Sequence, residues 1–361
     1  MSLTWIEISK SALLHNIAYF RSRNKGKKII AMVKSNAYGH GLLKVASLIK
    51  DEVDAFAVAD FQESMKLRSL LKQKPVFILL PVIEEQEVKE VAKSKVSLFV
   101  GNLQYLKFLS KINTNNKIKI HLEINSGINR TGIRPDELTK AMEIIEKSQT
   151  IELEGIFSHF ATLPANLNVA KKQIQTFRDV LKQVKDKNIW IHMENSAAAS
   201  MNLLPEANAI RPGISLYGLP PSPDYKLDIK PVLSLKSRII DIHFLDIGEG
   251  VSYDHTFITR RPSIIATLGI GYGDGYMRNL SNRAWVIIKG KKVPIVGRIC
   301  MNHILIDITD VPDVKLYETV TLIGKEGEEE ITATELAIKS GTINYEITTK
   351  LLPHIERIVV E

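Results

Sequence analysis

The 361-residue chain lacks several features that mark secreted, membrane-spanning or metal-binding proteins. Its single cysteine, Cys300, excludes an internal disulfide framework and fits a reducing compartment, so we expect a cytoplasmic protein. The longest apolar run, residues 75–83, is too short to span a bilayer, and no basic-then-apolar leader precedes Thr4, so we expect no membrane partner. No trio among the nine histidines has metal-ligand spacing, so we expect no metal.

The net charge of +8 raises the question of a nucleic-acid partner. The lysines are scattered, with short clusters only at residues 25–28 and 289–292, and no basic stripe is interleaved with aromatic residues. No recognisable nucleic-acid module is present. We therefore interpret the positive charge as solvated surface lysines that attract small anions, and we expect no nucleic-acid partner.

The first two thirds of the chain alternate short apolar runs with longer segments of helical period. Apolar strands separated by helices indicate parallel strands that are buried on both faces. The expected strands are Lys28–Val33, Ala55–Ala59, Pro75–Leu80, Val96–Val100, Ile118–Ile124, Leu153–Ser158, Trp190–Met193 and Ala209–Ile210. The expected helices include Gly41–Lys50, Phe61–Leu71, Pro135–Lys147 and Ala165–Lys185. Eight such units in about 220 residues predict an α/β fold of the TIM type, a (β/α)8 barrel.

The pattern changes after about residue 230, where strand signals with glycine-containing turns replace the helices. The expected strands are Val232–Asp246, Ser263–Gly269, Trp285–Lys289, Lys292–Val296, Ile304–Ile308 and Glu318–Ile323. One helix is expected, at Thr332–Ser340. We therefore predict a barrel over residues 9–229 and a mainly β C-terminal domain over residues 230–361, with residues 1–8 packing on the second domain.

Polar residues follow the predicted barrel strands where each strand ends. They are Lys34, Arg130, His159, Asn195, Ser196 and Arg211. The carboxyl ends of barrel strands meet at one rim, where barrel enzymes carry their chemistry, so we expect these side chains to converge.

The residue types on this rim suit one kind of ligand. A partly desolvated lysine with cationic neighbours favours its neutral amine, which can form an imine with an aldehyde. The last two strands of a barrel commonly supply a phosphate site, and here the Asn195–Ser196 pair and the Pro212–Ile214 turn offer hydroxyl and backbone N–H donors. An aldehyde that bears a phosphate is a description of pyridoxal phosphate.

Ordered sequence blocks across both predicted domains carry a family resemblance. The blocks are residues 4–8, 11–16, 31–41, 155–160, 195–198, 211–214, 251–253, 271–275, 296–301 and 342–346. Block 31–41, Ala-Met-Val-Lys-Ser-Asn-Ala-Tyr-Gly-His-Gly, is long and specific. Through these blocks the chain resembles the bacterial alanine racemases over essentially its whole length. The resemblance implies a barrel with a β domain, assembled as a head-to-tail homodimer with shared active sites.

The resemblance also implies a role for each matching residue. Lys34 would hold pyridoxal phosphate as a Schiff base, Arg211 would face the pyridine nitrogen, and His159 would lie near the ring. The phosphate group would be bound by Tyr38, Asn195, Ser196, Gly213, Ile214 and Tyr345. Arg130 would contact the phenolic oxygen and the substrate carboxylate. The partner subunit would contribute Tyr253 and Met301. The entrance would be lined by Tyr272, Arg278, Arg298 and Ile343.

These roles predict interconversion of L- and D-alanine by two bases, which would supply D-alanine for cell-wall peptidoglycan. Lys34 would serve the D-alanine face and Tyr253 the L-alanine face. Arginine only donates hydrogen bonds, so Arg211 should leave the pyridine nitrogen unprotonated and weaken the electron sink. We expect this to limit transamination. We interpret His192 as a supporting residue and Cys300 as a buried small hydrophobe.

The sequence departs from the family at three positions. The family often has a carbamylated lysine seven residues before the arginine that matches Arg130, and this chain has Glu123 there. Glutamate supplies a permanent carboxylate, so we predict that no carbon dioxide adduct is needed. Asn302 replaces a usual aspartate and Asp254 a usual glycine, and both flank the expected entrance.

Three alternatives stay open. A non-enzymatic pyridoxal-phosphate carrier would resemble the barrel alone, and the second domain with Tyr253 and Met301 argues against it. A decarboxylase of similar architecture would carry a different cysteine motif, whereas Cys300 lies in the racemase-like block. A racemase for another small amino acid such as serine is not separated from an alanine racemase by sequence.

Overall fold

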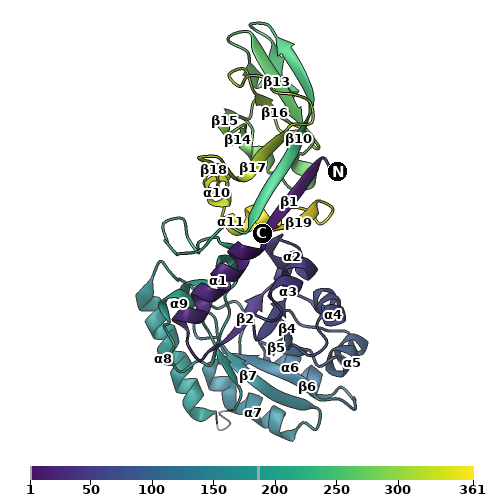
Figure 1. Cartoon of the computed structure of the whole chain (residues 1–361). Helices are drawn as coiled ribbons and strands as arrows, with labels where there is room; N and C mark the ends of the chain where they lie inside the picture. Colours follow the sequence, from purple (N-terminus) through teal and green to yellow (C-terminus); the bar gives the residue numbers. More distant parts are fainter. Residues whose placement is uncertain (1, 185–187) are drawn as a thin grey trace.

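The computed structural model describes residues 2–184 and 188–361 and consists of two parts (Figure 1). The lower part in this view is a closed barrel surrounded by helices, and the upper part is an elongated, mainly β domain. The chain begins with strand β1 (Thr4–Ser9) and helix α1 (Lys10–Arg23), which runs down from the second part to the barrel. In this view the C-terminus lies near the junction of the two parts, and the N-terminus lies farther up, beside the upper part.

The barrel is closed and has eight strands, each paired in parallel with its neighbours, which confirms the predicted fold class. The strands are β2 (Lys28–Met32), β3 (Ala55–Val58), β4 (Val76–Ile78), β5 (Ser97–Val100), β6 (Ile118–Glu123), β7 (Ile151–Phe157), β8 (Trp190–His192) and β9 (Ala209–Ile210). Most positions of these strands are buried, because helices cover the outside and side chains fill the inside. The strand ends differ by at most two residues from those predicted, and β9 matches its predicted bounds.

Short helical segments connect the strands. They are α2 (Lys34–Tyr38), α3 (Leu42–Ile49), α4 (Phe61–Leu70), α5 (Glu85–Lys93), α6 (Leu103–Ser110), α7 (Leu138–Lys147), α8 (Leu167–Gln183), α9 (Ser196–Met201) and the 3-10 turns η1 (Pro135–Glu137) and η2 (Ile214–Tyr217). The predicted helix 135–147 is divided, since its first three residues form η1 before α7 begins. The predicted helix 165–185 begins two residues later as α8, and its last predicted residue, Lys185, lies outside the described residues.

The second part is built on a nine-stranded sheet, which confirms a mainly β domain. The elements after the barrel are β10 (Leu233–Leu245), β11 (Gly250–Val251), η3 (Tyr253–His255), β12 (Phe257–Ile258), β13 (Ser263–Leu268), η4 (Tyr272–Asp274), η5 (Arg278–Leu280), β14 (Trp285–Ile288), β15 (Lys291–Pro294), β16 (Ile304–Asp307), β17 (Thr319–Glu326), β18 (Glu329–Ile331), α10 (Ala333–Ser340), α11 (Asn344–Thr349) and β19 (Glu356–Val360). Strand β1 lies in this sheet, antiparallel to β10 and parallel to β19.

The expectation of a single helix in the second domain is wrong. Helix α10 matches the predicted segment, but α11 follows it after a short loop. Six residues with three threonine or asparagine side chains give little helical signal, so α11 depends on its packing against α10 and the barrel. The division of the chain between residues 229 and 230 stays a prediction.

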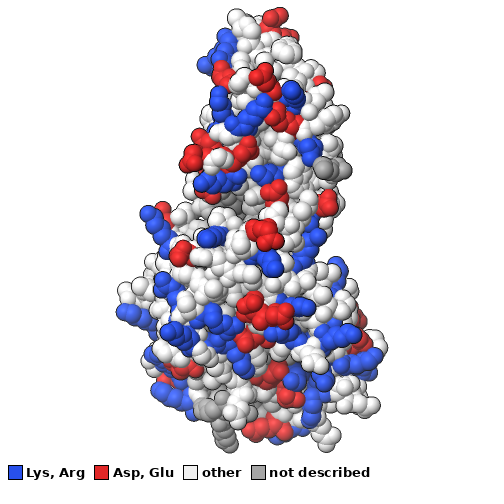
Figure 2. Space-filling model, viewed as in Figure 1, with Lys and Arg blue, Asp and Glu red and all other residues white. Residues whose placement is uncertain are grey.

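The described surface carries charges of both signs. On the face in Figure 2, lysine and arginine side chains alternate with aspartate and glutamate over both parts. Within residues 2–184 and 188–361, no helix has the length and apolar content needed to cross a membrane. Over the same residues, no three histidine, cysteine, aspartate or glutamate side chains form a group that could hold a metal ion.

Candidate active site

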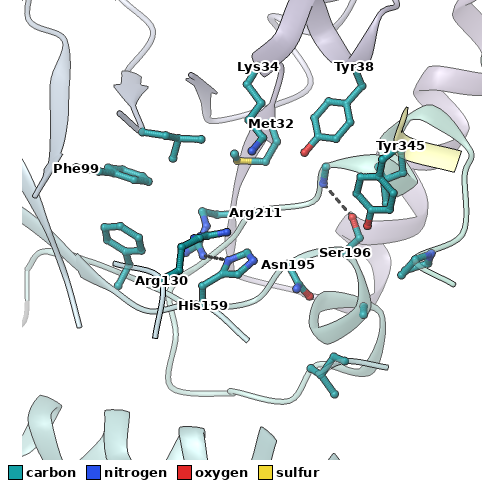
Figure 3. A pocket seen from close by; sticks show the side chains of 17 residues that line it. Met32, Lys34, Tyr38, Phe99, Arg130, His159, Asn195, Ser196, Arg211 and Tyr345 are labelled. Carbon is teal, nitrogen blue, oxygen red and sulfur yellow. Dashed lines mark hydrogen bonds between the residues drawn. The ribbon is translucent and has the colours of Figure 1, made fainter. Parts of the chain in front are cut away.

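A cavity of about 290 Å³ opens at the carboxyl ends of the barrel strands (Figure 3). The polar side chains predicted to converge all line it, namely Lys34, Arg130, His159, Asn195, Ser196 and Arg211. Tyr38, Gly213, Ile214 and Tyr345 line it as well. In Figure 3, the Tyr38, Tyr345 and Ser196 side chains gather on one side of the cavity, and Arg130, Arg211 and His159 gather on another. One cavity therefore contains an amine, a cluster of hydroxyls and a cationic group.

The segment that carries Lys34 has an unusual backbone. Four consecutive residues, Ser35 to Tyr38, have φ between 53° and 54°, which is the left-handed region. Each non-glycine residue in that region costs roughly 1–2 kcal/mol, so the surrounding structure must hold the turn. The Glu63 carboxylate accepts a hydrogen bond from the Asn36 N–H at 2.7 Å, and the Asn36 side-chain oxygen accepts one from the Leu42 N–H at 2.8 Å. Sequence reasoning missed Glu63, because such a turn has no propensity signal.

The surroundings of Lys34 favour its neutral form. Burial lowers the pKa of the Lys34 amine, and the positive charges of Arg130 and Arg211 lower it further, while Glu63 opposes them. A neutral amine is the nucleophilic form of lysine. The cavity therefore contains an amine whose surroundings favour its nucleophilic form.

The hydroxyl cluster is suited to an anion. The Ser196 hydroxyl oxygen accepts hydrogen bonds from the Gly213 N–H at 2.9 Å and the Ser215 N–H at 3.3 Å. Burial raises the pKa of Tyr345 to about 12 and raises that of Tyr38 as well, so both phenols keep their protons and can donate. Asn195 caps helix α9 by accepting from the Ala198 N–H at 3.1 Å. Neutral O–H donors beside a turn of backbone N–H groups form a site for a phosphate group.

Gly213 allows the Tyr38 hydroxyl to lie close to the backbone of this hydroxyl cluster. A Cβ atom built on Gly213 would lie 2.6 Å from the Tyr38 hydroxyl oxygen, which is closer than any real Cβ contact. Glycine therefore allows the phenol to approach the backbone of the Gly213 turn.

Arg211 is buried beneath the cavity, with only 4% of its surface exposed. Its Nη1 donates to His192 Nδ1 at 2.5 Å and to the His192 carbonyl at 3.1 Å. Its Nη2 donates to the Ser158 carbonyl at 2.8 Å and to His159 Nδ1 at 3.1 Å. Burial lowers the pKa of Arg211 to about 10, so the guanidinium is charged at neutral pH. Burial and the neighbouring cations lower the pKa of His159 to about 3, so that imidazole is neutral.

Arg130 and Glu123 lie near each other in sequence but are not directly paired. Arg130 is exposed at the cavity, and Glu123, at the end of β6, has 6% of its surface exposed. Within residues 2–184 and 188–361, no ion pair within 4.0 Å joins the two side chains. The Glu123 charge instead acts on Arg211, where it opposes the lowering of the pKa by burial. That Glu123 takes the place of a carbamylated lysine stays a prediction.

Tyr253 and Met301 lie outside this cavity within one chain. Both belong to the second domain, and their exposed fractions are 67% and 57%. Tyr253 lies in a shallow hollow with Asp254 and Cys300, and its neighbours Ser252 and Asp254 have φ of 63° and 59°. Backbone strain of this kind is concentrated at functional sites. Within one chain, Tyr253 and Lys34 therefore line different hollows.

The residues expected at the entrance also lie on the second domain. The Tyr272 N–H donates to the Cys300 carbonyl at 3.0 Å, while Arg278 and Ile343 are exposed. Arg298 forms an ion pair with Asp254, with Nε and Oδ2 2.6 Å apart. Asp254, one of the departures from the family, therefore restrains Arg298 beside Tyr253. Asn302 is exposed.

The fold and this cavity define a two-part barrel protein whose strand ends surround a lysine with a lowered pKa, a hydroxyl cluster and a buried arginine. Residues 8–221 match the family model for the alanine racemase N-terminal domain, and residues 232–359 match that for the C-terminal domain. The chain therefore belongs to the alanine racemase family.

Named relatives and solved structures agree with this assignment. The alanine racemase of Methylacidiphilum infernorum is 36% identical, over 98% of this chain and 92% of the relative. Alanine racemase 2 of Caldanaerobacter subterraneus is 37% identical, over 99% of this chain and 95% of the relative. The crystal structure of the Bacillus anthracis alanine racemase with bound L-Ala-P has a TM-score of 0.93 and 34% identity, covering 100% of this chain and 96% of that one.

Proposed function

We propose that this protein interconverts L-alanine and D-alanine, with pyridoxal phosphate attached to Lys34. The observation that carries the proposal is the cavity itself, which holds a lysine amine with a lowered pKa, a group of hydroxyl and backbone N–H donors and a buried arginine. The named relatives at 36–37% identity are alanine racemases, which supports alanine as the substrate. In that family the product D-alanine serves peptidoglycan synthesis, and a cytoplasmic location would fit this role.

The residues present fit pyridoxal phosphate. Tyr38, Tyr345, Ser196 and the backbone of Gly213 and Ile214 would hold the phosphate, and Arg211 would face the ring nitrogen. When bound, the cofactor supplies an electron-withdrawing ring that acidifies the Cα–H bond of an attached amino acid. Arg211 offers donors only, so it leaves the ring nitrogen its lone pair and moderates that withdrawal.

Two side chains would move the proton. Lys34 Nζ, whose pKa is lowered by burial and by Arg130, would accept or return the proton on the D-alanine face. Tyr253 Oη would do the same on the L-alanine face. Arg130 would hold the substrate carboxylate, because its exposed guanidinium lies at the cavity and can donate two parallel hydrogen bonds.

The protein would act as a homodimer with shared sites. Tyr253 and Met301 are exposed on the second domain and do not line the cavity of their own chain. A second copy placed head-to-tail would bring its Tyr253 hollow against this cavity and exclude water from it. The entrance would then be lined by Tyr272, Arg278, Arg298 and Ile343.

The test of the function is a chiral assay on the purified protein with added pyridoxal phosphate. We expect L-alanine to approach an equal mixture of enantiomers, and we expect the Lys34→Ala variant to lose this activity. Running L-serine in parallel separates an alanine racemase from a serine racemase. Bound cofactor with no turnover of either amino acid would support the carrier alternative and contradict the proposal.

A further inference from the structure

A continuous line of polar side chains crosses the barrel interior beneath the cavity. Arg211 Nη1 lies 2.5 Å from His192 Nδ1, and His192 Nε2 lies 2.7 Å from His121 Nδ1. His121 Nε2 lies 3.3 Å from the Glu154 carboxylate oxygen Oε2. Both imidazoles are fully buried, with exposed fractions of 0%. The line therefore joins a buried cation at the cavity to an anion near the other end of the barrel.

The chemistry of the two ends fixes the direction of every hydrogen bond. A guanidinium can only donate, so His192 Nδ1 accepts and His192 carries its proton on Nε2. That proton is donated to His121 Nδ1, which leaves the His121 proton on Nε2, where the carboxylate accepts it. Burial lowers the pKa of both histidines, although Glu154 opposes the shift at His121, and so favours a neutral ring with one proton at each. The opposite tautomers would place an N–H against the N–H groups of Arg211.

The barrel has a local irregularity at the site of this line. Strands β6 and β7 pair in register until Ile120 and Leu153, and then His121 pairs with Gly155, so Glu154 is an extra residue in β7. Such a bulge changes the direction of a side chain. A Cβ atom on Gly155 would lie 2.4 Å from His121 Nδ1, so only glycine leaves room for the imidazole. The bulge and the glycine together make the histidine pair possible.

The surroundings shield the two histidines from water and hold the carboxylate at the anionic end. Phe77 lies against the His121 ring, with centroids 4.4 Å apart, and Phe157 is stacked on His192 at 5.1 Å. Glu154 also accepts hydrogen bonds from the Ser97 hydroxyl and from Lys119 Nζ, the latter at 2.8 Å. In a low-dielectric interior such a chain is polarised along its length, since each donor strengthens the next.

We propose that Glu154 is a positioning residue for Arg211. Through His121 it fixes which nitrogen of His192 carries the proton. The unprotonated Nδ1 of His192 then accepts a hydrogen bond from the guanidinium and so sets the orientation of Arg211 beneath the cavity. Among the described residues Arg211 has no carboxylate within 4.0 Å, so this relay is its hydrogen-bonded connection to an anion. The consequence for catalysis rests on the proposed function, in which Arg211 faces the cofactor ring nitrogen.

The first measurement uses the unsubstituted protein without cofactor. Histidine side-chain nitrogen NMR on ¹⁵N-labelled protein, assigned with His121→Gln and His192→Gln, reports which ring nitrogen carries the proton. We expect both histidines to be neutral and protonated on Nε2. A proton on His192 Nδ1 would overturn the proposal, whether or not the protein racemises alanine.

The second measurement compares Glu154→Gln with Glu152→Gln. Glu152 lies on the same strand and pairs with the same Lys119, at 3.7 Å, so it is a matched control. We expect Glu154→Gln to give mixed tautomers at His121 and His192 and to lower kcat by about tenfold with the KM for alanine nearly unchanged, as loss of a supporting partner does elsewhere. Glu154→Asp should restore most of the original tautomers and most of kcat, and Glu152→Gln should change neither the tautomers nor kcat.

Unchanged tautomers and unchanged kcat in folded Glu154→Gln would overturn the proposal. If that variant does not fold, Ser97→Ala decides, because the Ser97 hydroxyl and His121 donate to the same carboxylate oxygen. We expect its loss to strengthen the bond from His121 and move the His121 Nε2–H resonance. An unmoved resonance would overturn the proposal.

Discussion

The Arg357 guanidinium donates two hydrogen bonds to the Gly39 carbonyl, from Nε at 3.2 Å and from Nη2 at 2.9 Å. It also donates to three carbonyls in the segment after α11, those of Leu351, Leu352 and Ile355. Gly39 ends the left-handed turn that carries Tyr38, and α11 carries Tyr345. One buried side chain from β19 therefore holds together the two segments that bring the tyrosine hydroxyls to the cavity.

Replacing Arg357 should affect both stability and cofactor binding. We expect Arg357→Ala to lower the free energy of unfolding by about 3 kcal/mol, because several buried carbonyls lose a charged donor. The affinity for pyridoxal phosphate should fall too, since Tyr38 and Tyr345 would no longer be held in register. Denaturant unfolding and equilibrium dialysis measure the two effects. The exposed Arg283 provides the control variant Arg283→Ala, and equal behaviour of the two variants would contradict this account.

Gly213→Ala should weaken cofactor binding while leaving the fold intact. The added methyl group would lie 2.6 Å from the Tyr38 hydroxyl oxygen and would displace the hydroxyl from the proposed phosphate site. We expect the dissociation constant for pyridoxal phosphate to rise by at least about tenfold, equivalent to about 1.4 kcal/mol. Gly269→Ala is the control, because its nearest neighbour would lie at an ordinary 3.4 Å. A similar small effect in both variants would show that Tyr38 does not need this approach.

The reactivity of Lys34 should depend on pH through Arg130. Burial and then Arg130 lower the pKa of Lys34, so its amine becomes neutral at a lower pH than an ordinary lysine. Removing that cation in Arg130→Met should raise the Lys34 pKa, and the pH profile for capture of pyridoxal phosphate should move to higher pH. Arg130→Lys keeps the charge and should leave the profile in place. Stopped-flow absorbance between pH 6 and about 10 measures both, and identical profiles for the two variants would exclude the electrostatic cause.

Activity should not depend on carbon dioxide, because Glu123 supplies a permanent carboxylate. We expect the same kcat in carbon-dioxide-free buffer and in bicarbonate. Glu123→Gln should lose about tenfold in kcat, since the buried charge that supports Arg211 is removed. Glu123→Lys should recover activity only in bicarbonate. If Glu123→Gln keeps full activity and cofactor affinity, the carboxylate has another role.

The barrel could be predicted from sequence because its strands are nearly continuous apolar runs. Even the two-residue strand β9 fits this pattern, since Ala209 and Ile210 are apolar and directly precede Arg211. Lys34 and Arg211 could be predicted as site residues because each is a polar residue that follows directly after an apolar strand. These features depend on local pattern, and the closure of the barrel then brings the strand ends together.

Other features depend on contacts between distant residues and have no local signal. The left-handed turn after Lys34 includes Ala37, which rarely adopts positive φ. Arg357 lies on a strand that is mostly exposed, so its burial could not be inferred. The hydrogen bond from His121 to Glu154 requires a bulge in β7. The sequence feature that accompanies this bulge is Gly155, which leaves room for the His121 ring.

The central claim is that Lys34 of one chain and Tyr253 of another complete each site, and subunit mixing tests it most directly. Lys34→Ala and Tyr253→Phe proteins, each impaired alone, would be unfolded together, refolded and assayed for racemisation of alanine. Random pairing makes half of the dimers mixed, and each mixed dimer contains one intact site, so we predict recovery of about a quarter of the unsubstituted activity. No recovery above the sum of the two variants would contradict a shared site and with it the two-base account.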